Sequence, residues 1–172
     1  MFGDETTTDQ DRCWRPSTAP VRGAVVTDPI SLCVERWHRH LAGDLDGGLD
    51  ALLHEGCVFL SPIVFTPQRG REITKLYLSA AGSTLVGSPS DAPEVGVESG
   101  RPFHYTKQIL QGNHGMLEFE TEIEGKYVNG VDIITCDDDA MITEFKVLIR
   151  PLQAVNLVHA QMKATLERLA AG

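Results

Sequence analysis

The sequence predicts an α+β fold in which helices pack on one face of a curved, mostly antiparallel sheet. Helical spacing of apolar residues occurs in the first half of the chain and again at its C-terminal end. Between these regions, several segments alternate apolar and polar residues with the period of two that is typical of half-buried strands. Helices followed by a meander of strands and a last helix are typical of an α+β domain.

Length and charge limit what the chain can be. At 172 residues it is long enough for one domain and short for two. Residues 1–26 lack periodicity and are expected to form a flexible leader, which places the domain at residues 27–172. A formal net charge of -9 argues against nucleic acid and anionic membranes as partners. No signal peptide and no apolar run of about 20 residues is visible, which favours a cytoplasmic protein.

Three helices are expected before residue 82. Asp28 and Pro29 predict the start of the first helix, and Gly43 predicts its end. Asp44 is expected to cap a short second helix, and a third is expected from about Glu72 to Ala81. Their apolar stripes are Ile30-Cys33-Val34-Trp37-Leu41, Leu45-Leu49-Leu52-Leu53 and Ile73-Leu76-Tyr77-Ala80, with Glu35, Arg36 and Arg39 facing solvent.

The first strand is expected at residues 57–60, where Ser61-Pro62 ends it. Residues 63–71 are expected to form a loop, and a second, longer surface loop rich in Gly, Ser and Pro is expected at 82–102. Residues 116–123 then alternate apolar side chains with three glutamates, which predicts a strand with one buried face and one wet face.

The acidic turn 137–139 joins the last two predicted strands, which span residues 127–136 and 142–150. Pro151 then opens the last helix, because proline is tolerated at the start of a helix. Its expected apolar side contains Leu152, Val155, Val158, Met162, Leu166 and Leu169.

Asp132 lies in the first of these two strands and has an unusual setting. Strand alternation places it on the same face as Gly130, Ile134 and Cys136, which predicts a carboxyl group among apolar side chains. Such a group is costly to bury unless it is paired, hydrogen-bonded or protonated, so we expect its pKa to be raised. Two interpretations stay open: an acid that lines a pocket, or a structural acid that ties its strand to Trp37 or to a water molecule.

These elements resemble the nuclear transport factor 2-like superfamily, and more narrowly its SnoaL-like and ketosteroid-isomerase-like proteins. The resemblance covers about residues 28–165. It is carried by residues 42–47 (Ala-Gly-Asp-Leu-Asp-Gly), by the strand that ends in Ser61-Pro62, and by residues 131–134 and 142–146 around the acidic turn. It implies a cone-shaped barrel of a curved mixed, mostly antiparallel sheet wrapped around N-terminal helices, plus a C-terminal helix. It also implies one deep pocket, a homodimer through the outer sheet face, and no metal or organic cofactor.

The resemblance also implies roles for three positions. Asp132 falls where ketosteroid isomerases carry the carboxylic acid of their oxyanion hole. Ser61 stands where those enzymes carry an aspartate as general base, and serine cannot take a carbon-bound proton at neutral pH without a partner base. Arg36, beside Trp37, stands where they carry a tyrosine. Because two of the three positions differ, steroid isomerisation is not expected.

Other candidate site residues come from several elements. His104 and His114 lie at strand ends, where loops often carry function, and are weak catalytic candidates beside Asp132. His38 and His40 point to different sides of the first helix and are expected at the surface. The expected pocket residues are Trp37, Ser61, Tyr77, Tyr105, Phe119, Ile134, Phe145 and Val147.

Two functions stay open. The first is a small-molecule pocket protein of the SnoaL-like type, working as a cofactor-independent isomerase, cyclase or hydrolase on a hydrophobic carbonyl or epoxide compound. The second is a non-catalytic ligand-binding or dimeric interaction module. A homodimer is expected in either case, held partly by charge between Glu118-Glu120-Glu122 and Lys146-Arg150.

The four cysteines stand far apart and show no spacing typical of a metal site. Cysteine is among the residues most often buried as a free thiol. Buried thiols are therefore expected at Cys33, Cys57 and Cys136, and one thiol, Cys13, in the leader.

Overall fold

The computed structural model describes residues 28–85 and 101–171. The expected leader at residues 1–26, with Cys13, and residues 86–100 of the expected surface loop lie outside the described residues, so these expectations stay predictions. Residues 82–85 continue a helix instead of starting that loop.

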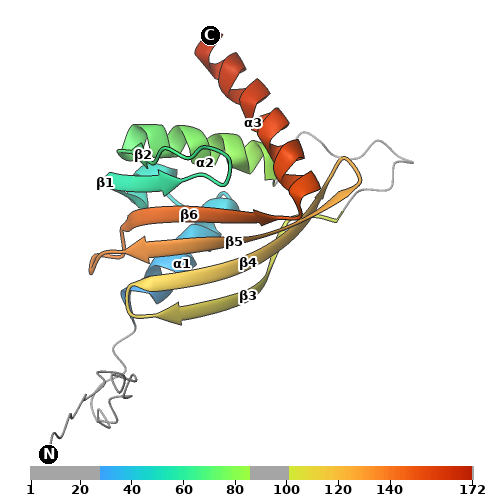
Figure 1. The fold of residues 1–172 in the computed structure, drawn as a ribbon. Coiled ribbons are helices and arrows are strands. Elements are labelled where there is room, and N and C mark those ends of the chain that lie inside the picture. The colour runs from blue at the N-terminus through green and yellow to red at the C-terminus, as the bar shows by residue number, and fades with distance from the viewer. Residues whose placement is uncertain (1–27, 86–100, 172) are drawn as a thin grey trace, which may run out of the picture.

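A six-stranded sheet forms the centre of the fold (Figure 1). Its order is β2-β1-β6-β5-β4-β3, in which β1 and β6 pair in parallel and all other neighbours are antiparallel. The sheet is therefore mixed and mostly antiparallel, as predicted, but β2 and β3 do not pair and the barrel stays open. The strands are β1 (Leu53–Leu60), β2 (Gln68–Arg69), β3 (His104–Gln111), β4 (His114–Ile123), β5 (Lys126–Cys136) and β6 (Ile142–Arg150).

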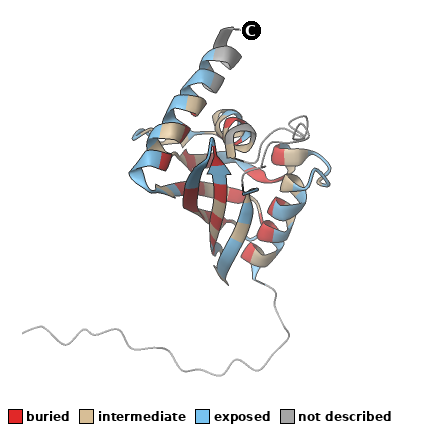
Figure 2. Ribbon diagram, turned by 90° about the vertical axis from the view of Figure 1, so that its right-hand side faces the viewer, coloured by how far each residue is buried: buried red, intermediate tan, exposed pale blue. Residues whose placement is uncertain are grey.

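The helices of the described residues are α1 (Pro29–Leu41), the 3₁₀ helix η1 (Gly48–Ala51), α2 (Arg71–Leu85) and α3 (Leu152–Ala171). In Figure 1, α1 lies behind strands β3 to β6, α2 lies above β1, and α3 rises from the end of β6. Helix α2 packs on β1 and on α3. Figure 2 shows that the far end of α3 extends away from the body of the molecule. None of these helices combines the length and the hydropathy needed to cross a bilayer.

The start of α1 is fixed by Asp28, although its side chain does not cap the helix. Its Oδ2 accepts a hydrogen bond from the Gly112 N–H at 2.8 Å, and the Gly112 carbonyl accepts one from the Ile30 N–H at 3.1 Å. These two bonds tie the beginning of α1 to the turn between β3 and β4. The helix ends at Leu41, and Gly43 follows with a φ of 78°, which confirms the predicted end.

The prediction that Arg36 faces solvent is wrong, because its side chain is half-buried. Its guanidinium group donates hydrogen bonds to the backbone carbonyls of Ala51 and of Ala140, the latter at 3.3 Å. Ala51 ends η1 and Ala140 follows the acidic turn, so Arg36 joins α1 to two distant parts of the chain.

The second predicted helix is shorter than expected. Gly47 and Gly48 adopt φ values of 77° and 53°, which an α-helix does not allow. Only one 3₁₀ turn therefore forms, and Leu53 enters β1 instead, where it pairs with Ile142 of β6. Strand β1 is thus longer than the predicted residues 57–60, and the expected loop after it contains the short strand β2.

The buried faces of α2 and α3 differ from their predicted stripes. In α2, Ala80 is buried as predicted, but Thr74 and Leu78 are buried as well, one turn apart, and Leu76 between them is exposed. In α3, the buried residues among the side chains that the structure describes are four apart and are Ala154, Val158 and Met162, so the prediction is confirmed at Val158 and Met162. The side chains of Leu166 and Leu169 lie outside this description, and their burial stays a prediction. Leu152 was predicted to be apolar core, but 72% of it is exposed.

The strand patterns that predicted the sheet are confirmed. In β4, β5 and β6 the inward residues alternate with outward ones, as the burial of Leu117, Phe119, Thr121, Ile123, Gly130, Asp132, Ile134, Cys136, Phe145 and Val147 shows. Trp37 is buried against this face, with its ring centroid 5.0 Å from that of Phe145, whereas Leu41 is only half-buried. Cys33, Cys57 and Cys136 are buried free thiols, as predicted.

Gly130 allows the Phe119 ring to lie directly against the sheet. The two residues are opposite each other in β4 and β5. A Cβ atom at Gly130 would overlap the edge of the Phe119 ring and would come 2.7 Å from the Leu148 carbonyl oxygen. The absence of a side chain at this position therefore determines where Phe119 packs.

We expect Gly130→Ala to lower the free energy of unfolding by about 1–3 kcal/mol, because the added methyl group must displace Phe119 or the backbone of β6. Gly82→Ala is the matched control. Outside its own helix backbone, no described atom lies within 4 Å of a Cβ at Gly82, and alanine favours helix over glycine, so this variant should be at least as stable as the wild type. Urea unfolding of both variants measures the difference, and equal stabilities would contradict the proposed packing.

Candidate functional site

A cavity of about 430 Å³ lies between the inner face of the sheet and the helices. Helices α1, α2 and α3 and strands β1, β3, β4, β5 and β6 contribute to its wall. Most of the lining side chains are aliphatic or aromatic, including Phe59, Leu78, Phe103 and Met162. The cavity also reaches exposed Ser79 on α2, which places part of its wall at the surface.

Of the eight expected pocket residues, the structure places these five on the cavity wall: Trp37, Tyr105, Phe119, Phe145 and Val147. Ser61, Tyr77 and Ile134 do not line it. Ser61 turns into the loop after β1, where its Oγ accepts hydrogen bonds from the N–H groups of Ile63 at 3.1 Å and Val64 at 3.3 Å. The Tyr77 ring packs on Phe59, with centroids 5.5 Å apart, and Ile134 is completely buried.

Asp132 lines the cavity and ends a chain of hydrogen bonds. The Trp37 Nε1–H donates to the Tyr105 hydroxyl oxygen at 2.8 Å, and the Tyr105 hydroxyl donates to Asp132 Oδ2 at 2.6 Å. The chain connects α1, β3 and β5, three elements that are far apart in the sequence. Within the described residues, Asp132 Oδ1 has no hydrogen-bond partner, and only 5% of the residue is exposed.

Burial raises the pKa of Asp132 from its ordinary value of 3.8 to about 7, although the Tyr105 hydrogen bond lowers it in part. The pKa of Tyr105 is raised well above its ordinary value by burial and by the neighbouring Asp132. Tyr105 therefore stays protonated and remains a donor. Asp132 keeps its own proton in mildly acidic solution and loses it near neutrality.

His40 also lines the cavity, although it was expected at the surface. It is half-buried, and its ring centroid lies 5.6 Å from that of Trp37. Burial lowers the pKa of His40 from 6.5, so the neutral imidazole is the main form at pH 7. Its position three residues after Trp37 is the sequence signal for this placement, because residues three apart share a helix face.

The two histidines that were weak catalytic candidates do not line the cavity. Both are exposed. The His104 Nδ1 lies 3.0 Å from the Pro102 carbonyl oxygen, and the His114 Nδ1 lies 3.2 Å from the Thr135 Oγ1. In residues 28–85 and 101–171, no three His, Cys, Asp or Glu side chains gather as a metal site would require.

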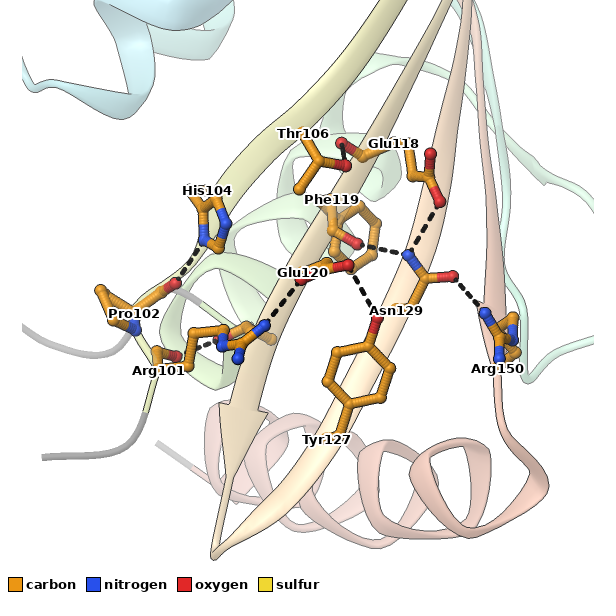
Figure 3. Close-up of polar contacts among 11 residues, drawn as sticks. Arg101, Pro102, His104, Thr106, Glu118, Phe119, Glu120, Tyr127, Asn129 and Arg150 are labelled. Atoms are coloured by element: carbon orange, nitrogen blue, oxygen red, sulfur yellow. Dashed lines mark hydrogen bonds and ion pairs between the residues drawn. The ribbon is translucent and has the colours of Figure 1, made fainter. Parts of the chain in front are cut away.

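Two outward glutamates of β4, Glu118 and Glu120, form hydrogen bonds on the other face of the sheet (Figure 3). Glu118 accepts from Asn129 Nδ2 at 3.2 Å and from Lys107 Nζ at 2.9 Å. Glu120 accepts from the Tyr127 hydroxyl at 2.8 Å and from Arg101 at 2.9 Å. These carboxylates therefore have partners within the chain and lie outside the cavity.

Comparisons with known proteins identify the fold through solved structures. No protein-family model matches the chain, and no curated protein matches it. A steroid delta-isomerase from Pseudomonas aeruginosa is similar, with 25% sequence identity and a TM-score of 0.70 over 84% of this chain and 96% of that chain.

Two further structures have the same fold. A protein with a cystatin-like fold from Silicibacter pomeroyi DSS-3 shares 24% identity, with a TM-score of 0.62 over 77% of this chain and 83% of that chain. An NTF2-like protein of unknown function from Mesorhizobium loti shares 18% identity, with a TM-score of 0.54 over 72% of this chain and 95% of that chain. At these identities the likeness supports the fold and not a reaction.

We expect the raised pKa of Asp132 to make its contribution to stability fall as the pH rises from about 4 to about 7. In this window the native state keeps the Asp132 proton and the unfolded state has lost it, so the contribution of Asp132 to the free energy of unfolding falls by about 1.4 kcal/mol per pH unit. Asp132→Asn removes this contribution. The stability of this variant relative to the wild type should therefore rise by on the order of 4 kcal/mol across the window.

Urea unfolding at several pH values measures this difference. Asp139→Asn, in the exposed acidic turn, is the matched control and should follow the wild-type pH dependence. A difference between Asp132→Asn and the wild type that stays constant with pH would show that Asp132 ionises normally in the folded protein.

Proposed function

We propose that this chain, which has the nuclear transport factor 2-like fold, binds an apolar small molecule with a carbonyl, phenol or epoxide oxygen in its cavity. The fold agrees with the resemblance found in the sequence, which is thereby confirmed. One observation carries the proposal: Asp132 faces an otherwise largely apolar cavity, and its Oδ1 accepts or donates no hydrogen bond within the residues that the structure describes. A protonated acid in this position is a hydrogen-bond donor for a ligand oxygen.

The wall of the cavity supports an apolar ligand with few polar atoms. Aromatic side chains from β1, β3, β4 and β6 surround Asp132, with Phe103 packed between Tyr105 and Phe119 at centroid distances of 5.2 Å from each. A ligand that fills about 430 Å³ here would remove a large apolar area from water, and each Å² contributes about 25 cal/mol. The Asp132 hydrogen bond would then fix its orientation.

The same geometry supports acid catalysis. A donor aimed at a carbonyl or epoxide oxygen stabilises the negative charge that develops there during isomerisation, cyclisation or ring opening. We therefore propose a cofactor-independent isomerase, cyclase or hydrolase as the enzymatic form of this function. The similarity to a steroid delta-isomerase supports a cavity of this type. Steroid isomerisation itself is not proposed, because Ser61 replaces the expected base and its hydroxyl is turned into a loop.

A non-catalytic binding module is the second candidate. The absence of a carboxylate at position 61 favours it, because that position supplies the base in the enzymes that the sequence resembles. Both candidates need the cavity and Asp132 for binding, and they differ only in whether a bound molecule reacts.

We expect Asp132→Asn to weaken binding of β-naphthol and β-tetralone by about tenfold. The asparagine carbonyl cannot donate to the ligand oxygen, and the asparagine N–H is a weaker donor than the carboxylic acid O–H. Titration calorimetry below pH 7 measures binding, and thermal melting measures stability. Asp139→Asn is again the matched control. Unchanged binding together with a lowered melting temperature would make Asp132 a scaffold residue and would remove the support for this function.

We also propose that the protein forms a homodimer through the outer face of the sheet. Ile109, Met116 and Leu148 are 61%, 44% and 53% exposed there, next to half-buried Val131 and Ile133. Strand pairing places Ile109 beside Met116, Met116 beside Ile133, and Val131 beside Leu148. We call these five residues the outer apolar patch. A second copy can cover such a patch symmetrically.

The charges of this face favour an apolar contact over the charge-based one expected from the sequence. Glu118 and Glu120 already have partners in the same chain, and Lys146 pairs with Glu144 at 3.2 Å. The glutamates of β4 and the basic residues Lys146 and Arg150 of β6 lie on the same face of the sheet. They therefore do not form two opposite surfaces of unlike charge.

We expect Leu148→Asp to shift the protein to monomers, because it places a charge in the outer apolar patch. Leu152→Asp is the matched control, since Leu152 is 72% exposed but lies outside the patch, at the start of α3. Sedimentation velocity at several protein and salt concentrations measures the assembly, which should depend little on salt. A wild-type monomer at every concentration would rule out the dimer.

A further inference from the structure

Among the residues that the structure describes, three titratable side chains line the cavity, and they come from three elements. Asp132 lies on β5, Tyr105 on β3 and His40 on α1. Tyr105 and Asp132 are joined by a hydrogen bond, whereas no hydrogen bond or ion pair joins the His40 imidazole to any described residue; only the His40 backbone carbonyl is engaged, by the Gly43 N–H at 3.0 Å. The two ring nitrogens of His40 are therefore not engaged by the part of the chain that the structure describes.

We propose that His40 is the proton acceptor for a bound apolar ketone whose carbonyl oxygen is held by Asp132. The ligand would then be a substrate with an acidic C–H bond next to the carbonyl group. This inference rests on the proposed function, because it needs a ligand oxygen at Asp132.

The positions of the two groups support this pairing. Trp37 contacts both groups, directly or through one residue: its ring centroid is 5.6 Å from that of His40, and its Nε1–H donates to Tyr105, which donates to Asp132. His40 follows Trp37 by one helical turn, so both side chains lie on the cavity side of α1. A ligand bound at Asp132 and lying along the Trp37 side of the cavity would extend toward His40.

The setting of the His40 ring suits a proton acceptor. The residue is half-buried, and its ring lies beside η1, where Nδ1 would be 3.9 Å from a Cβ atom at Gly48. No charged side chain shifts its ionisation, and burial alone keeps it neutral. Burial acts on Asp132 in the opposite sense and keeps it protonated up to about pH 7. An acid and a base with such opposed environments can both be in their reactive forms at one pH.

No other lining residue can take this role. The cavity wall of the described residues contains no glutamate, lysine or arginine, and Tyr105 is held as a donor by Asp132. Glu118 and Glu120 lie on the opposite face of the sheet, where they are paired (Figure 3). Ser79 lines the wall but is a hydroxyl without a described partner base.

His40 and Asp132 together would convert the bound ketone to its enol. His40 takes the proton from the carbon next to the carbonyl group, and the electron pair of the broken C–H bond forms a C=C bond. The carbonyl π pair moves to oxygen, which takes the proton of Asp132 and becomes an enol hydroxyl. His40 is then an imidazolium and Asp132 a carboxylate. Reversal returns a proton to carbon, and in heavy water the imidazolium exchanges first, so that deuterium is incorporated.

Deuterium incorporation into β-tetralone in heavy water, followed by proton NMR, tests this inference. We expect the wild type to accelerate the exchange above the buffer rate. His40→Gln and His40→Ala should each lower the enzymatic rate by about 100-fold while still binding β-tetralone. Added imidazole should restore part of the rate to His40→Ala. His159→Gln, at an exposed histidine of α3 outside the cavity, is the matched control and should keep the wild-type rate.

The pH profile provides a readout that a structural role would not change. The wild-type rate should rise with pH as His40 loses its proton below pH 6.5 and fall near pH 7 as Asp132 loses its own. His40→Gln should lose the rising limb and keep the falling limb. Melting temperatures close to that of the wild type would verify that both variants are folded.

The outcomes separate this inference from the proposed function. If the wild type binds neither β-tetralone nor β-naphthol, both are overturned. If it binds β-tetralone but exchange is no faster than in buffer, or if the His40 variants keep the wild-type rate, the role of His40 is overturned and the binding function stands. A 100-fold loss in both His40 variants with rescue by imidazole supports the role of His40.

Discussion

The burial of one carboxyl group constrains the whole interior. Moving Asp132 into an apolar cavity costs several kcal/mol of free energy if the carboxyl group stays charged. Its raised pKa lets it keep its proton up to about pH 7, and one hydrogen bond from Tyr105 stabilises it further. That hydrogen bond depends on a second one from Trp37, so α1, β3 and β5 must keep their mutual positions. A purely structural acid would be expected to have both oxygens bonded, as most buried polar groups do. The free Oδ1 instead faces the cavity.

The cavity depends on packing details elsewhere in the sheet. The edge of the Phe119 ring lies against Gly130, and this ring forms part of the cavity wall. Helices α2 and α3 supply the apolar side opposite the sheet, through residues such as Leu78 and Met162. Because these helices pack on each other, a shift of α3 would change the cavity, although the described α3 residues on its wall, Val158 and Met162, are apolar.

The sequence predicted the elements whose pattern is local. Strands β4 to β6, the first helix and the inward position of Asp132 follow from periods of two and 3.6 residues together with turn and cap residues. The fold class followed from the order of these elements. The extent of the second helix was wrong because two consecutive glycines adopt positive φ, a conformation that their neighbours do not specify.

The candidate site was less predictable, because long-range contacts create it. Residue type and periodicity do not indicate that Tyr105 meets Asp132, 27 positions later, or that helices α2 and α3 reach the wall. Ser61 was placed at the pocket by its position before Pro62, but two local backbone hydrogen bonds turn it away. His40 shares a helix face with Trp37, and this spacing was available in the sequence.

The charge distribution determines what kind of molecule suits the cavity. The chain carries a net charge of -9, yet Glu118 and Glu120 of β4 are paired on the far face of the sheet, and the wall of the cavity contains no lysine or arginine among the described residues. An anion would be desolvated there without a cation to pair with, because burial keeps His40 neutral at pH 7. A cation would meet a full negative charge only above about pH 7, where Asp132 ionises. A neutral molecule with one accepting oxygen avoids both costs, and this is the chemistry that the cavity favours.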